Sequence, residues 1–362
     1  MDVNDCPFGA GHDVRPPRVV GREAAFLAVA DLLGQLEAET PSEAVVLAGV
    51  PGVGRTAVLK ELHDRVPEAW TIVSPMVAGL APGDAAVAVL SALAGHLEAL
   101  DAASPALRLA QGALDGERSA IVGGSADALA TVVASFAMAV AVLENGAVVL
   151  LIDDLDGSDL ARHNVVIDGL AAGSKRGFPL GVVVSTLVDP GLEIPGRVVG
   201  LDPLDVADLE DGARLPAAAK GRPVTNDALE AIALHSEGHP WLVQALMAAA
   251  WTPSGEAITG GQINQRVPVA QAQYRSAVVD PALARLGPGA LRYLRAVATA
   301  DVITHAAVSQ SLGDTNRFGG GGGSAMSDVR DELRRVGLLR SPDGDQLVLP
   351  LPGQRLRLLA DM

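Results

Sequence analysis

The residues best suited to chemistry lie in a glycine-rich segment, residues 49–56, with the sequence Gly-Val-Pro-Gly-Val-Gly-Arg-Thr. It follows a short β-branched run, 44–48, and leads into a helical pattern over about 55–65. Glycines let the backbone N–H groups of such a loop converge on phosphate oxygens, and the start of the following helix adds partial positive charge. The hydroxyl of Thr56 is a suitable ligand for Mg²⁺. The segment therefore predicts a phosphate-binding loop, and the alternative is an ordinary strand–turn–helix connection.

Arg55 stands where a phosphate-binding loop of this pattern has lysine. Lysine carries a compact ammonium group, whereas the guanidinium group of arginine is planar, bulkier and suited to bidentate contacts. The chain has 24 arginines and 3 lysines, so this position follows the general bias of the composition. We expect nucleotide binding to persist in an altered form and hydrolysis to be impaired.

A second group of candidates follows the most apolar strand pattern, residues 147–152, which ends in Asp153 and Asp154. This is a Walker B pattern, in which a buried strand delivers carboxylates to the edge of a sheet. We expect Asp153 to hold Mg²⁺ through water and Asp154 to act as the base that orients the attacking water. The alternative is a strand that ends in a solvated aspartate turn. Asp156, close by, is interpreted as a helix cap.

Three further positions carry weaker signals. Ser185 and Thr186 end the next strand pattern, where a polar side chain is able to sense a γ-phosphate or simply to cap the strand. Arg197 precedes the last strand pattern and is a candidate arginine finger, in cis or in trans, with a surface arginine as the alternative.

The order of these patterns predicts the fold class. Short strands over 44–48, 70–73, 147–152, 180–186 and 196–201 alternate with helices and are apolar on both faces, which is typical of a parallel α/β sheet. Helices fill most of 82–143, with breaks at Ser104–Pro105 and Gly123–Gly124. The predicted domains are an arm (1–18), a nucleotide-binding domain (19–203), a helical lid (204–252), a connector (253–284) and a winged helix-turn-helix domain (285–362).

The last region has the element order of a winged helix: helices over 288–299, 303–312 and 327–336, then a hairpin-like stretch over 346–351. A glycine tract, 319–323, separates the second and third helices, and we expect poor order there. From residue 285 onward the net charge is about +2, whereas the preceding 284 residues carry −18. Arg330, Arg334 and Arg335 are spaced to share one helix face, where a DNA-reading helix would lie. The preferred interpretation is a winged helix that contacts protein or packs against the nucleotide-binding domain as a regulatory lid.

Composition excludes several classes of protein. The formal net charge of −16 argues against a general grip on nucleic-acid phosphates. Cys6 is the single cysteine, so neither a disulfide framework nor a cysteine-ligated metal cluster is expected. The N-terminus is acidic and does not resemble a secretory signal, and the apolar run 128–143 is too short for a membrane span and is interpreted as a buried helix. A cytoplasmic protein is expected.

With these residues in place, the chain resembles P-loop ATPases of the AAA+/STAND group, and in particular an actinobacterial ATP-binding family similar to origin-recognition-complex ATPases. The resemblance rests on the phosphate-binding loop, the acidic strand end, the Gly-Arg-Glu segment at 21–23 and the Gly-His-Pro segment at 238–240 followed by Trp251. It implies ATP or ADP and Mg²⁺ as ligands. It also implies nucleobase contacts by Val19, Val20, Gly21 and Pro240. Arg55 and Asp154 depart from the lysine and glutamate usual in that group.

The predicted site residues are then as follows. The catalytic candidates are Asp154, Arg55 and Arg197, and the metal ligands are Thr56 and Asp153. The cofactor-binding set is Val19, Val20, Gly21, Gly49, Pro51, Gly52, Val53, Gly54, Arg55, Thr56, Ala57, Ser185, Thr186 and Pro240.

Three hypotheses about function remain open. The first is a nucleotide-dependent regulatory ATPase with slow hydrolysis, whose state is reported by the winged helix to a protein partner. The second is a DNA-binding initiator or transcription regulator, and the third is a P-loop scaffold that no longer hydrolyses ATP. Neither the partner nor the oligomeric state follows from the sequence.

Overall fold

The structure is a computed structural model, and it describes residues 6–11, 14–67, 70–144, 146–252, 256–300, 303–313, 322–342 and 345–360. The chain divides into two compact units. The first, called here the sheet unit, comprises Glu23–Ala48 and Val58–Gly200. The second, called the loop–lid unit, comprises Met1–Arg22, Gly49–Ala57 and Leu201–Met362, and it therefore contains the phosphate-binding loop.

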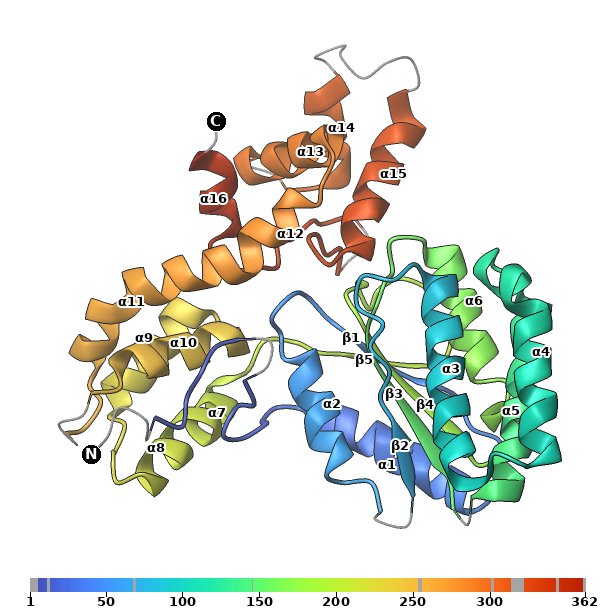
Figure 1. The fold of residues 1–362 in the computed structure, drawn as a ribbon. Helices are drawn as coiled ribbons and strands as arrows, with labels where there is room; N and C mark the ends of the chain where they lie inside the picture. Colours follow the sequence, from blue (N-terminus) through green and yellow to red (C-terminus); the bar gives the residue numbers. More distant parts are fainter. Residues whose placement is uncertain are drawn as a thin grey trace. The chain divides into compact units, whose positions relative to one another are not determined.

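The sheet unit contains a five-stranded parallel sheet in the order β2-β3-β4-β1-β5 (Figure 1). Its strands are β1 (Val45–Ala48), β2 (Thr71–Val73), β3 (Val148–Leu155), β4 (Leu180–Thr186) and β5 (Arg197–Gly200). All five strands predicted from the sequence are confirmed. The central strands β1 and β4 are buried along their whole length, which is why their sequences are continuous apolar runs rather than alternating ones.

Helices of the sheet unit are α1 (Glu23–Glu37), α2 (Arg55–His63, whose first turn belongs to the loop–lid unit), α3 (Pro82–Asp101), α4 (Pro105–Val122), α5 (Ala126–Leu143) and α6 (Leu160–Leu170). The helix breaks predicted at Ser104–Pro105 and Gly123–Gly124 are confirmed. The side chains of Ser104 and Ser125 accept hydrogen bonds from the N–H groups of Leu107 and Ala128 and so cap α4 and α5. Phe136 on α5 is completely buried in the core of this unit.

Two of these helices, α3 and α5, are long and apolar enough to span a membrane by length and composition alone. About half of each apolar window is buried inside the unit. Their buried residues line the core beside β3 and β4, so core packing accounts for their apolar character. The sequence-based prediction of a buried helix over 128–143 agrees with this arrangement.

The loop–lid unit is helical after Pro203. It contains α7 (Val206–Leu209), the π-helical turn η3 (Glu210–Arg214), α8 (Leu215–Ala219), α9 (Asn226–Ser236) and α10 (Pro240–Ala250). The predicted connector is itself largely helical, because α11 (Gly260–Tyr274), the π-helical turn η4 (Arg275–Val279) and α12 (Asp280–Ala284) follow one another directly. A capping box at Thr259 and Gln262 starts α11, which continues through Pro268.

The C-terminal part contains α13 (Pro288–Thr299), α14 (His305–Gly313), α15 (Gly322–Arg335) and α16 (Gln354–Ala360). Instead of a regular hairpin, single antiparallel bridges join Thr304 to Gln346 and Arg340 to Val348. This order agrees with the predicted winged helix as far as the bridges, whereas α16 was not expected from the sequence. Most of the predicted glycine tract lies outside the described residues, and Gly322 and Gly323 begin α15.

The packing of α5 leads to a first prediction. Replacing Phe136 by alanine removes a completely buried ring from the core, and we expect the free energy of unfolding to fall by about 3–5 kcal/mol. Met138→Ala on the same helix is the matched control, because Met138 is 53% exposed and its loss is expected to cost less than about 0.5 kcal/mol. Urea unfolding followed by circular dichroism measures both. Equal losses in the two variants would contradict the assigned core.

Candidate nucleotide-binding site

The phosphate-binding loop begins with a β-turn. The N–H of Val53 donates to the carbonyl of Val50 at 3.3 Å, and Gly52 has a φ of +76°. Proline at the second position and a left-handed glycine at the third are the signature of a type II turn. Gly54 is also left-handed, with a φ of +98°. Backbone N–H groups in such alternating conformations form the concave anion-binding arrangement that the sequence predicts, immediately before α2.

The carbonyl groups of this loop have donors elsewhere in the loop–lid unit. His239 Nε2 lies 3.0 Å from the carbonyl oxygen of Pro51 and donates to it. Arg22, which is 5% exposed, donates from Nη2 to the carbonyl of Val53 at 2.9 Å and from Nη1 to the carbonyl of Gly21 at 2.7 Å. The Gly-Arg-Glu and Gly-His-Pro segments therefore both contact the loop backbone.

His239 is the N-cap residue of α10 and is 1% exposed. Its ring meets the ring of Tyr274 edge-on, with centroids 4.9 Å apart. Burial, aided by the positive charge of Arg22, lowers the pKa of His239 to about 4, so the ring is neutral near pH 7. Burial likewise raises the pKa of the Tyr274 hydroxyl far above its usual range. The lid thus offers the loop a neutral donor.

The predicted nucleobase residues lie against the first helices of the lid. Gly21 has a φ of +63°, and a Cβ at this position would meet the carboxylate of Asp208, so the position favours glycine. The Val20 side chain packs against Gly212 of η3. Pro240 is the first residue of α10, where its fixed φ suits the start of a helix. The structure therefore brings Val20, Gly21 and Pro240 into the same unit as the loop.

The acidic strand end contains a β-bulge. Ile152 pairs with Val184 and Leu155 pairs with Thr186, so that Asp153 and Asp154 together oppose the single residue Ser185. Asp154 has a φ of +59°, one of three positive-φ residues other than glycine in the described chain. Aspartate tolerates this left-handed conformation better than most residues. Bulges of this kind redirect a side chain away from the regular alternation of a strand.

Ser185 holds the bulge together with its hydroxyl group. It donates to Asp153 Oδ1 at 2.5 Å and accepts the N–H of Asp154 at 2.9 Å. Thr186 donates to the carbonyl of Leu155 at 3.1 Å, and its oxygen lies 3.2 Å from Nε2 of the buried His163. Burial lowers the pKa of His163. Both hydroxyls are completely buried and support the acidic segment, and whether either one senses a γ-phosphate stays a prediction.

Two predictions near the sheet need correction. Arg197 is the first residue of β5 and pairs with Val45 at the start of β1. It therefore lies at the amino end of the parallel strands, whereas Asp153 and Asp154 lie toward the carboxyl end of β3. Its guanidinium contacts Asp31, and it is 49% exposed at the side chain. A role as arginine finger in cis at the acidic edge is therefore wrong. Asp156 does not cap α6, because Asp159 does.

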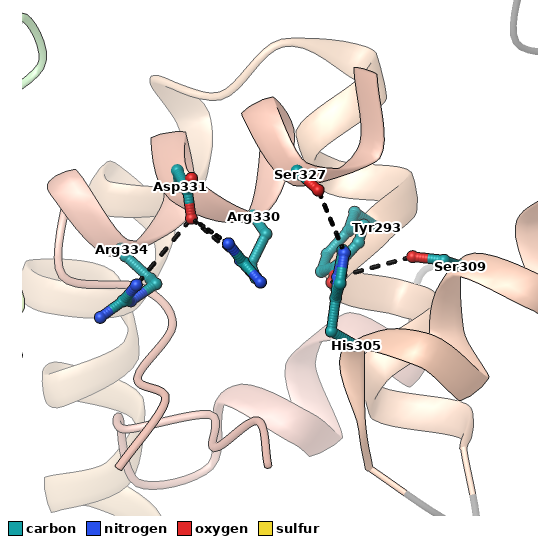
Figure 2. Close-up of polar contacts among 7 residues, drawn as sticks. All are labelled: Tyr293, His305, Ser309, Ser327, Arg330, Asp331 and Arg334. Carbon is teal, nitrogen blue, oxygen red and sulfur yellow. Dashed lines mark hydrogen bonds and ion pairs between the residues drawn. The ribbon is translucent and has the colours of Figure 1, made fainter. Parts of the chain in front are cut away.

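Two of the arginines of α15, Arg330 and Arg334, form ion pairs within their own helix. Figure 2 shows Arg330 and Arg334 turned toward the carboxylate of Asp331, at 2.9 Å and 3.9 Å. Their side chains are only 21% and 13% exposed. Beside them, His305 lies between the hydroxyl groups of Tyr293, Ser309 and Ser327, which ties α13, α14 and α15 together (Figure 2). These ion pairs weigh against DNA contact, which was the less favoured of the interpretations drawn from the sequence.

One buried cation of the lid was not predicted from the sequence. Arg222 is completely buried, stacks over Trp251 at 4.6 Å and donates to the carbonyls of Thr252 and Glu256. Trp251 also contacts Phe8 of the N-terminal arm, and the centroids of the two rings are 5.8 Å apart. His239 was noted as part of a motif but given no role. Neither contact has a local sequence signal, because each joins segments that are far apart along the chain.

The structure thus gathers the predicted residues into two groups. The loop–lid unit contains the phosphate-binding loop, the nucleobase segment and the lid contacts, and the sheet unit contains the acidic bulge with Ser185 and Thr186. The chain connects them directly, because β1 ends at Ala48 and the loop begins at Gly49. Strands β1 and β3 are parallel members of one sheet and end at the same edge of it.

Comparison with known proteins agrees with this arrangement. Residues 18–184 match the family described as the AAA ATPase domain, a stretch that includes both the loop and the acidic strand end. No curated protein sequence matches the chain significantly.

Solved structures are similar to the chain at low sequence identity, and the first of them, with a TM-score above 0.5, shares its fold. A Walker-type ATPase of Pyrococcus abyssi is 12% identical, with a TM-score of 0.58, and the match covers 96% of this chain and 99% of that one. The ORC1 protein of Aeropyrum pernix in complex with DNA is 17% identical, with a TM-score of 0.48 and coverage of 96% and 93%. The RuvB Holliday junction branch migration motor of Thermotoga maritima is 16% identical, with a TM-score of 0.42 and coverage of 91% and 92%.

The left-handed conformation of Asp154 leads to a prediction about stability. Asp154→Val places a β-branched side chain at a φ of +59°, and we expect the free energy of unfolding to fall by about 1–2 kcal/mol. Asp154→Asn is the matched control, since asparagine tolerates the same conformation, and its change is expected to stay within about 0.5 kcal/mol. Urea unfolding at pH 7 compares the two. A valine variant as stable as the asparagine variant would contradict the assigned backbone conformation.

The buried imidazole leads to a prediction about pH. The folded pKa of His239 is about 4, below the unfolded value near 6.5, so the unfolded chain binds the proton more readily. Its contribution to stability is therefore present above pH 6.5 and is lost as the pH falls through 4. Between pH 7.5 and pH 5 the loss amounts to about 2 kcal/mol.

The test compares urea unfolding of the wild type and of His239→Gln, whose side chain does not titrate, at these two pH values. The wild type is expected to lose about 2 kcal/mol more than the variant on acidification. Identical losses would show that His239 is protonated in the folded chain.

Proposed function

Residues 18–184 match the AAA ATPase domain family, and on this basis we propose that the chain is a nucleotide-binding ATPase that acts as a regulatory switch driven by ATP and ADP. In this proposal the nucleotide state of the phosphate-binding loop sets the arrangement of the lid, and the C-terminal helical region presents that state to a protein partner. Hydrolysis is slow, so the lifetime of each state is long.

One observation carries the proposal: the loop packs against the lid and against the helix that leads to the C-terminal region. A Cβ added at Gly52 would lie 2.8 Å from His239, 3.4 Å from Trp241 and 3.4 Å from Val278. Val278 belongs to η4, which follows α11 and precedes α12 and α13. A shift of the loop on binding phosphate would therefore displace two segments of the same unit, α10 and η4. This is the kind of packed, two-position contact through which switch proteins transmit ligand binding.

The residues present suit a Mg²⁺–nucleotide ligand. Mg²⁺ beside substrate phosphates is held by oxygen ligands. The proposed ligands here are the hydroxyl group of Thr56, at the start of α2, and the carboxylate of Asp153. When bound, the ion neutralises charge on the phosphates. Arg55 is the first residue of α2. The remaining residues proposed to surround the phosphates are Arg55, Gly49, Gly54 and Ala57.

Slow turnover follows from two substitutions. Arg55 replaces a lysine whose compact ammonium normally reaches the phosphates, and Asp154 is shorter by one methylene than the glutamate usual at the base position. Asp154 is the proposed base that orients water, and its side chain direction is fixed by the bulge. For Arg197, the remaining proposed catalytic role is that of an arginine finger in trans, which acts on the nucleotide of another molecule.

Titration with fluorescent mant-ATP and mant-ADP, with and without Mg²⁺, tests the proposal. We expect micromolar binding of both nucleotides by the wild type and tighter binding of mant-ATP with Mg²⁺. Arg55→Ala removes the cation of the cradle and is expected to weaken binding about tenfold or more. Arg108→Ala on the remote helix α4 is the control and should leave binding unchanged. Absence of binding at millimolar nucleotide overturns the proposal.

A second measurement addresses turnover. Phosphate release by the wild type is expected to be slower than about one per minute, Arg55→Lys to be faster, and Asp154→Asn to be inactive while still binding nucleotide. Rapid hydrolysis by the wild type would exclude a long-lived switch. Loss of nucleotide binding in Asp154→Asn would show that this carboxylate serves binding rather than the chemical step.

A further inference from the structure

The central peptide of the loop turn has two possible orientations. In the turn Val50–Val53, the peptide between Pro51 and Gly52 points one way in type II and the opposite way in type I, with little change in the flanking residues. The φ of +76° at Gly52 selects type II. No peptide bond of the described chain is cis, so the Pro51 carbonyl and the Gly52 N–H point in opposite directions. A flip of this one peptide would therefore exchange a donor for an acceptor on the inner side of the loop.

One side chain fixes this orientation. His239 Nε2 donates to the Pro51 carbonyl at 3.0 Å, which directs the carbonyl toward the lid and the Gly52 N–H away from it. The ring has no room to leave, because it is 1% exposed, packs on Tyr274, and lies within 2.8 Å of the position a Cβ on Gly52 would take. Glycine at 52 thus permits both the turn type and the close approach of the imidazole.

The tautomer of His239 is set by the same contact. Nδ1 is buried and has no hydrogen-bond partner among the described residues, whereas Nε2 faces a carbonyl oxygen, which only accepts. The proton therefore resides on Nε2. Burial beside Arg22 keeps the ring neutral, so the donor is present throughout the range from about pH 5 upward.

We propose that His239 is a positioning residue for phosphate binding: it holds the Pro51–Gly52 peptide in the orientation that presents the Gly52 N–H, rather than the Pro51 carbonyl, to the phosphate chain of the nucleotide. This inference rests on the proposed nucleotide binding and deepens it by naming the group that prepares the loop. In this proposal His239, which precedes Pro240, serves the binding of the phosphates and not of the nucleobase. The ligand it favours is a nucleoside diphosphate or triphosphate over a monophosphate, because the loop cradles the phosphates beyond the sugar.

The test compares His239→Met with His239→Gln. Both side chains are unbranched and similar in size, but only glutamine retains a donor that reaches a carbonyl. Dissociation constants for ADP and AMP are measured by competition with mant-ADP. We expect His239→Met to weaken ADP binding about tenfold, which is the effect of about one lost hydrogen bond, and to change AMP binding less than about twofold. His239→Gln is expected to keep the wild-type ratio within about threefold.

Each outcome decides one question. If the wild type binds neither nucleotide, nucleotide binding itself is refuted. If the wild type binds and His239→Met keeps the ADP-to-AMP ratio, the positioning role is overturned, and an equal loss of both nucleotides also overturns it, because that result indicates lid packing alone. His235→Met, at the partly exposed histidine of α9 that contacts Asn264, is the control and should behave as the wild type.

A measurement on the unaltered protein keeps the proposal testable if the variants fail to fold. Nitrogen-15 NMR of histidine side chains at pH 7 is expected to show one slowly exchanging ring with its proton on Nε2. Loss of the signal in His239→Gln assigns it to His239. If that variant does not fold, single variants of the other six histidines assign it by elimination. A neutral ring with its proton on Nδ1 would remove the donor on which the inference depends.

Discussion

A loop that binds phosphate through its backbone must turn N–H groups inward, and this constraint leaves its carbonyl groups in need of donors on the outer side. In this protein the donors come from segments remote in sequence. His239 of the lid serves Pro51, and Arg22 of the N-terminal segment serves Val53. Two elements that family patterns associate with the base thus also hold the loop. The phosphate loop and the lid therefore belong to one compact unit, whereas the strand that precedes the loop belongs to the other.

The acidic strand end meets a comparable constraint by a different device. A regular strand would direct Asp153 and Asp154 to opposite faces of the sheet. The bulge gives Asp154 a left-handed backbone, and the Ser185 hydroxyl satisfies both the Asp153 carboxylate and the Asp154 N–H. Such a backbone favours a short side chain that tolerates positive φ. Aspartate at this position is therefore compatible with the local geometry.

Much of the fold could be predicted from the sequence because its signals are local. The strand β4 over 180–186 and the helix α13 over 288–299 have the predicted bounds, and serine caps mark the breaks around α4. The connector was not predicted as a helix, because Pro268 and several glutamines mask the continuity of α11. Pro203 marks the predicted end of the nucleotide-binding domain, close to Leu201, where the chain enters the loop–lid unit for the last time.

The site was predictable in part. Motif spacing located the loop and the acidic carboxylates, because those residues are contiguous. The error at Arg197 has a simple cause: the sequence places it beside a strand, but only the parallel register shows that it lies at the amino end of β5, level with Val45. The contacts of His239 with Pro51 span 188 residues and have no local pattern.

The two departures from the family pattern differ in kind, and this difference bears on how the protein works. Asp154 has a left-handed backbone conformation that aspartate tolerates well, although Glu39 and Glu237 adopt the same conformation elsewhere in the described chain. Arg55 follows the general composition of the chain, which prefers arginine to lysine by 24 to 3. The proposed site keeps a loop whose carbonyl groups are bound by His239 and Arg22, and a carboxylate that lies on a bulge. In the proposed switch, arginine in place of lysine is therefore expected to affect the rate of the chemical step more than nucleotide binding.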